Sequence, residues 1–178
     1  MNFNDELMLL LKARYPVIYI HTIEEDRVEY IIRKNIKTKL NRSIYTWDFV
    51  DGYTNNPNNE GFGRRNPLQA LELVERLTSE TPALFLLKDF NRFLTDISIS
   101  RKLKNLSRVL KLRPKTIIII GSELNIPTEL QDLITVLNFQ LPIENEINQE
   151  LCRLLRSLNL EINSQLIEKL TRACQGLS

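Results

Sequence analysis

The sequence predicts an α/β fold in which a doubly wound, parallel, five-stranded sheet carries helices on both faces. Apolar, β-branched runs such as Val17-Ile18-Tyr19-Ile20 continue without polar alternation, as strands buried on both faces do. Segments with helical spacing of apolar residues alternate with these runs. The 178 residues, 43% hydrophobic and 26% charged, have the composition of an ordinary globular chain that can bury a core.

Each expected strand is a short run of apolar and β-branched residues. Thr116–Ile120 is a very apolar run, and Ala83–Leu87 contains no polar residue at all. In chain order, we expect strands at Pro16–Ile20, Ser43–Val50, Ala83–Leu87, Thr116–Ile120 and Thr135–Leu141.

The expected helices carry apolar residues at spacings of three and four. The second begins after Thr22, which stands three residues before Glu25 in the spacing of a capping box. The last ends before Gly176, a residue suited to a helix C-cap. In chain order, we expect helices at Asn4–Arg14, Ile23–Leu40, Pro67–Thr78, Asn91–Leu112, Ile143–Leu158 and Asn163–Gln175.

Composition excludes several classes of function. The 24 Lys and Arg nearly balance the 22 Asp and Glu, giving a net charge of +2. The longest apolar runs, Leu7–Leu11 and Ile117–Ile120, are far shorter than the ~20 residues that cross a bilayer. Two cysteines and one histidine cannot supply the four ligands of a structural zinc site. We therefore expect a soluble, unsecreted chain without a membrane span and without a bound metal.

Ligands of such sheets bind beyond the carboxyl ends of the strands. There, the turn from His21 to Asp26 has neither glycine nor lysine, and it places three carboxylates at a helix N-terminus, where a phosphate would otherwise bind. The sequence thus predicts no cofactor in this chain. We interpret His21 as a hydrogen-bonded or surface residue and Asp89 as a helix cap, although Asp89 also occupies the place of a magnesium ligand. The degenerate pocket positions are His21, Thr22, Glu25, Asp89 and Ser122.

Two surfaces are candidates for partner binding. A basic stripe on one helix face could hold phosphate groups or an acidic partner, or be a solvated face. The segment Asp51–Asn66, rich in glycine and asparagine, predicts an exposed loop whose aromatic and basic residues either contact a partner or fold back onto the domain. The stripe consists of Arg101, Lys104, Arg108 and Lys111, and the loop candidates are Tyr53, Phe62, Arg64 and Arg65.

The segments Ala83–Phe90 and Thr116–Ser122 resemble the core of an AAA+ ATPase, a P-loop NTPase with strand order 5-1-4-3-2. In that family the third strand ends in the metal-coordinating Walker B acid, and the fourth ends in a polar sensor residue. The run Ile134–Pro142 with the acidic helix start at Glu144 and Glu146 is similar to the step into the helical lid.

More specifically, Leu10–Ile20, Glu24–Ile31 and Arg172–Ser178 resemble the N-terminal part of the plastid and cyanobacterial AAA+ proteins called hypothetical chloroplast reading frame forty-six. The resemblance implies a degenerate AAA-like domain over 1–142, the start of a lid over 143–178, and a chain that is a fragment. It places Walker A on His21–Glu25 and Walker B on Leu84–Phe90, with Lys88-Asp89 in place of two acids.

We therefore expect a non-hydrolysing interaction and regulatory domain, in the chloroplast stroma or the cyanobacterial cytoplasm. Its expected partners are a downstream ATPase domain in cis, which binds ATP and magnesium, an unknown protein, and further copies in a homo-oligomer. Two alternatives remain. Glu24, Glu25, Asp89 and Ser122 also suit a receiver-like signalling domain, although Gln140-Leu141-Pro142 lacks the lysine expected there. The basic stripe would suit nucleic acid.

Overall fold

Six strands form one sheet in the order β3-β2-β4-β5-β1-β6 in the computed structural model, which describes residues 2–54, 60–77, 80–139 and 150–154. Five strands are parallel and follow the predicted order 5-1-4-3-2, which confirms the doubly wound AAA-like arrangement. These are β1 (Val17–His21), β2 (Ser43–Asp48), β4 (Ala83–Lys88), β5 (Lys115–Gly121) and β6 (Ile134–Asn138).

The sixth strand corrects the predicted count of five. β3 (Gly52–Thr54) pairs antiparallel with β2, inside the segment expected to be an exposed loop. β2 ends at Asp48, not at Val50, because the Asp48 carboxylate accepts hydrogen bonds from the backbone N–H groups of Val50 and Asp51, at 2.9 and 2.8 Å. This turn reverses the chain, and Gly52 follows it with a φ of +70°.

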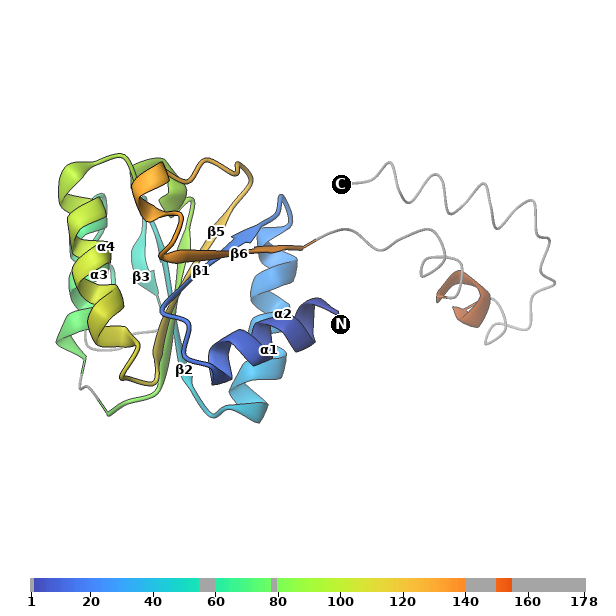
Figure 1. Ribbon diagram of the computed structural model, residues 1–178. Helices are drawn as coiled ribbons and strands as arrows, with labels where there is room; N and C mark the ends of the chain where they lie inside the picture. The colour runs from blue at the N-terminus through green and yellow to red at the C-terminus, as the bar shows by residue number, and fades with distance from the viewer. Residues whose placement is uncertain (1, 55–59, 78–79, 140–149, 155–178) are drawn as a thin grey trace. The chain divides into compact units, whose positions relative to one another are not determined.

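Helices cover both faces of the sheet (Figure 1). α1 (Phe3–Lys12) and α2 (Glu25–Lys39) pack with Ile18 and Ile20 of β1. α3 (Pro67–Arg76) and α4 (Ile97–Leu110) pack with Val17 and Tyr19, which point to the opposite face. The alternation of β1 side chains between two apolar clusters explains why this strand is apolar at every position.

Two predicted helix starts are wrong. The helix expected from Asn91 is divided into the short 3-10 helix η1 (Phe90–Phe93) and α4, whose N-cap Asp96 accepts hydrogen bonds from the N–H groups of Ser98 and Ile99. The capping box at Thr22 does not form, because Thr22 Oγ1 accepts from the N–H of Glu24 at 2.9 Å in a local turn. α2 therefore begins at Glu25.

A second short 3-10 helix, η2 (Thr128–Leu130), precedes β6. The chain divides into two units, 1–139 and 140–178, and in the second unit residues 150–154 are helical. Apart from those five residues, the predicted helices Ile143–Leu158 and Asn163–Gln175 lie outside the described residues, as do the predicted boundary at 142 and the acidic helix start.

Gly52→Ala should destabilise the protein more than Gly61→Ala, by about 1–3 kcal/mol. Both glycines have positive φ, but a Cβ at Gly52 would lie 2.6 Å from the backbone carbonyl oxygen of Gly61. A Cβ at Gly61 would meet only the flexible Arg64 side chain, at 3.1 Å. Urea unfolding of the two variants measures the difference, and equal costs would contradict the β3 hairpin.

Candidate functional site at the carboxyl edge of the sheet

His21 bridges two neighbouring strands at the carboxyl edge. Its Nε2 donates to the carbonyl oxygen of Ser122 at 3.1 Å, and its Nδ1 lies 3.2 Å from the side-chain amide of Asn138. Both ring nitrogens therefore have partners, from β6 and from the chain that follows β5. This geometry agrees with the predicted hydrogen-bonded histidine.

Acidic residues occupy the first turn of α2. Thr22, which is 7% exposed, lies in the turn before α2. Glu24, Glu25 and Asp26 follow it. Burial raises the pKa of Glu25, and the carboxylates of Asp89 and Asp26 raise it further, although the ammonium of Lys88 acts in the opposite direction. This helix end thus carries an excess of negative charge, which disfavours an anionic ligand.

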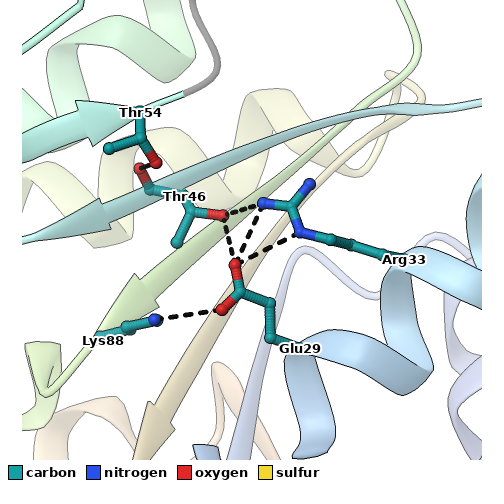
Figure 2. A network of polar contacts seen from close by, with 5 residues as sticks. All are labelled: Glu29, Arg33, Thr46, Thr54 and Lys88. Atoms are coloured by element: carbon teal, nitrogen blue, oxygen red, sulfur yellow. Dashed lines mark hydrogen bonds and ion pairs between the residues drawn. The ribbon is translucent and has the colours of Figure 1, made fainter. Parts of the chain in front are cut away.

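A network centred on Glu29 joins α2 to the ends of β2 and β4 (Figure 2). One oxygen of the Glu29 carboxylate lies 3.1 Å from the ammonium of Lys88, the last residue of β4. The other accepts hydrogen bonds from Arg33 at 3.1 Å and from the Thr46 hydroxyl at 3.2 Å. Arg33 also donates to Thr46 at 2.7 Å. Glu29 and Lys88 are only 19% and 18% exposed, so solvent screens their attraction weakly.

The network determines the charge of its members. Burial alone would raise the pKa of Glu29, but hydrogen bonds and charges from Lys88 and Arg33 outweigh it and lower the pKa. Burial alone would lower the pKa of Lys88, but Glu29, with Glu25 and Asp26, raises it. Both groups are therefore charged at neutral pH. The sequence analysis did not identify Glu29, although its spacing of four from Arg33 was a visible signal.

Asp89 lies at the N-cap position of η1, as our interpretation expected, but its side chain makes no capping hydrogen bond. Its backbone has a φ of +58°, and its N–H donates to the carbonyl oxygen of Ile120 at 2.8 Å. Within the described part of the chain its exposed carboxylate makes no hydrogen bond or ion pair. The side chain faces an open groove of about 520 Å³.

This groove brings together two of the predicted pocket positions, Glu25 and Asp89. Phe49 and Phe93 stack in its wall with ring centroids 5.5 Å apart. His21, Thr22 and Ser122 are not among its lining residues. The groove is lined by Glu25, Asp48, Phe49, Val50, Lys88, Asp89, Arg92 and Phe93.

Ser122 follows a tightly packed strand end. A Cβ at the preceding residue, Gly121, would lie 2.5 Å from Asn91 Oδ1 and 2.6 Å from the Tyr19 hydroxyl, so only glycine fits there. The Tyr19 hydroxyl donates to the carbonyl oxygen of Glu123. Burial, with the charges of Glu123 and Asp89, raises the pKa of Tyr19 to about 12. The phenol is therefore a fixed donor and not a base.

The basic stripe on α4 is partly neutralised. Lys104 forms a 3.2 Å ion pair with Glu129, which also accepts a hydrogen bond from Ser100 at 2.7 Å. Arg101, Arg108 and Lys111 are exposed and belong to none of the ion pairs among the described residues. The stripe thus keeps three of its four predicted charges available to a partner.

The four loop candidates divide between the two alternatives. Tyr53 is fully buried in β3, where its hydroxyl donates to the carbonyl oxygen of Ala70, so it cannot present its ring to a partner. Phe62 is half-buried, and the Arg76 guanidinium lies 4.9 Å from its ring centroid. Only Arg64 and Arg65 are exposed. The two aromatic residues, Tyr53 and Phe62, therefore fold back onto the domain.

No group of three or more His, Cys, Asp or Glu side chains in the described ranges is placed to hold a metal ion. Among the same residues, no helix is long and apolar enough to cross a membrane.

Comparison with known proteins places this architecture in a family. Residues 3–139 match the SpoVK-like AAA ATPase, N-terminal domain. The chain belongs to this family. It is also 83% identical over 178 residues to the AAA domain-containing protein ycf46 of Trieres chinensis, and 52% identical to that of Pyropia yezoensis. Each match covers the whole chain but 36% of the relative, so the chain spans about a third of these relatives' length.

Solved structures share the fold of the family. A chain of the E. coli MS115-1 HORMA:CdnC:Trip13 complex is similar with a TM-score of 0.58 and 13% identity, covering 96% of this chain and 62% of that one. The replication initiator DnaA bound to AMPPCP and single-stranded DNA is similar with a TM-score of 0.55 and 14% identity, covering 94% and 54%. At these identities the likeness concerns the fold alone.

Replacing Glu29 by Gln should lower the free energy of unfolding at pH 7 by about 1–3 kcal/mol, because Lys88 and Arg33 would lose their counter-ion. The pKa of Glu29 is lower in the folded than in the unfolded chain, so its contribution is present above pH 4.5 and is lost as the pH falls through the folded value. E29Q should therefore lose less stability on acidification than the wild type.

Urea unfolding between pH 7 and about pH 3 measures this difference. Glu75→Gln is the matched control, because Glu75 is 61% exposed and pairs with Lys102 at the surface. If E29Q and E75Q had the same acid dependence, the network would not be a determinant of stability.

Proposed function

We propose that this chain is a non-hydrolysing interaction and regulatory domain of an AAA ATPase. The observation that carries the proposal is the Lys88–Glu29 ion pair at the end of β4. Lys88 occupies the position at which the family resemblance implies a metal-coordinating acid. A lysine side chain supplies no oxygen ligand, so this position lacks the carboxylate that would bind magnesium.

The turn after β1 supports the same conclusion. It contains no glycine and no lysine, and its first α2 turn holds Glu24, Glu25 and Asp26. A phosphate cradle needs backbone N–H groups open to the anion and a cationic side chain nearby. Here the N–H of Glu24 already donates to Thr22. Burial raises the pKa of Glu25, so this side chain provides no cationic contact for a phosphate.

The relatives' length is compatible with a further domain that hydrolyses ATP. Because this chain matches about a third of each ycf46 protein, we propose that a downstream ATPase domain in cis binds ATP and magnesium. The present domain would contact and regulate that domain, recruit a protein partner, and contribute to a homo-oligomer of the full protein. The relatives' ycf46 name supports a location in the chloroplast stroma, or in the cytoplasm of cyanobacterial relatives.

The structure gives less support to the two alternatives. A receiver-like domain needs its acids and a hydroxyl around one pocket, and Ser122 does not line the groove that holds Glu25 and Asp89. Binding of nucleic acid, or of an acidic partner, through α4 would use Arg101, Arg108 and Lys111, since Lys104 already has a counter-ion. Both alternatives stay predictions.

Isothermal titration of the chain with Mg·ATP should give no saturable heat at millimolar nucleotide, because carboxylates replace the phosphate cradle. The Lys88→Met variant should be titrated in parallel. It removes the cation but keeps the acidic turn, so we expect that it does not bind Mg·ATP either. Saturable binding by the wild-type chain with submillimolar affinity would contradict the proposal.

The regulatory part of the proposal has a separate test. The segment that follows this region in the Trieres chinensis relative can be produced alone and its ATP turnover measured with and without this chain. We expect addition of the chain to change the turnover rate about twofold or more, which corresponds to a coupling above ~0.4 kcal/mol. An unchanged rate at saturating chain would contradict regulation in cis.

A further inference from the structure

A cavity of about 260 Å³ lies between α3 and α4, away from the carboxyl-edge groove. Its inner wall is aliphatic, because Val74, Leu106 and Leu110 are each less than 5% exposed. Val109 lies at the cavity as well and is 41% exposed, which places it at the mouth. An aliphatic wall with an open mouth suits a small molecule with an apolar body.

A buried cation closes one end of this cavity. Lys115, the first residue of β5, is 2% exposed and lines the cavity with its side chain. Its ammonium donates to the carbonyl oxygens of Leu77 at 2.6 Å and Val74 at 3.3 Å, at the C-terminal end of α3. Among the residues that the structure describes, these two neutral carbonyl groups are the acceptors of its three N–H donors.

No carboxylate in the described ranges forms an ion pair with Lys115. The cavity is instead rich in positive charge, because Arg113 and Lys102 also line it. Its acidic residue, Glu75, already pairs with Lys102. Burial lowers the pKa of Lys115, and the nearby Arg113 guanidinium lowers it further. An anion in the cavity would relieve both effects.

We propose that this cavity binds a small organic acid, whose carboxylate would contact Lys115 and Arg113 and whose aliphatic body would lie against Leu106 and Leu110. The carboxylate would supply the missing charged acceptor of a buried ammonium, an arrangement that gives stronger hydrogen bonds than neutral carbonyl groups. The apolar body would fill a space that protein side chains leave open between the two helices.

Titration of the chain with sodium hexanoate, followed by the amide NMR signals of Leu106, Val109 and Leu110, tests the proposal. We expect saturable shifts with a millimolar Kd, weaker shifts with hexanol, which has no charge, and none with hexylammonium. Arg113→Gln should weaken hexanoate binding about tenfold, and Val109→Phe should block the mouth. Lys115→Met should abolish charge-dependent binding.

Lys104→Met is the matched control, because Lys104 is on α4 but does not line the cavity. It should bind hexanoate as the wild type does. If Lys115→Met fails to fold, R113Q and V109F decide the question, since both alter partly exposed side chains. The absence of saturable shifts in the wild type, equal affinity for hexanol and hexanoate, or unchanged binding in both R113Q and V109F would overturn the proposal.

Discussion

The ion pair between Lys88 and Glu29 determines the chemistry of the carboxyl edge. It holds an ammonium at the end of β4 and at the same time connects α2 with β2, through Arg33 and the buried hydroxyl of Thr46. Thr46 is tied in turn to the edge strand β3 by Thr54, whose hydroxyl donates to its carbonyl oxygen at 3.4 Å. A position that the AAA+ resemblance assigns to a metal ligand is thus part of the scaffold.

Two lysines on neighbouring strands show how the environment gives the same side chain different roles. Lys88 ends β4 and has a carboxylate partner, so its pKa is raised. Lys115 begins β5 on the amino edge, donates to two carbonyl groups of the described residues, and has a lowered pKa. The first is a neutralised structural cation, whereas the second is a buried ammonium whose partners among the described residues are neutral carbonyl groups. The sheet therefore has a neutralised polar network at its carboxyl edge and a buried ammonium at its amino edge.

The sequence predicts the parallel core well because its strands are apolar on both faces and its helices are amphipathic. Prediction from the sequence is wrong where hydrogen bonds of individual side chains determine the local backbone conformation. The Asp48 turn that creates β3 and the Asp96 cap that starts α4 depend on hydrogen bonds between particular atoms. The site is predicted in part: Glu25 and Asp89 do share a groove, but the Glu29 network depends on a tertiary contact between α2 and β4 that periodicity cannot reveal.

The central claim is that the Lys88 ammonium, held by Glu29, leaves no place for a metal-bound nucleotide at this edge. Paramagnetic broadening of NMR signals by Mn·ADP tests this claim most directly. The amide signals of Thr22, Lys88 and Asp89 would broaden if a manganese ion were bound close to them. The account predicts no broadening at these three positions beyond that of exposed amides elsewhere in the chain. Selective loss of the Lys88 and Asp89 signals at substoichiometric Mn·ADP would contradict it.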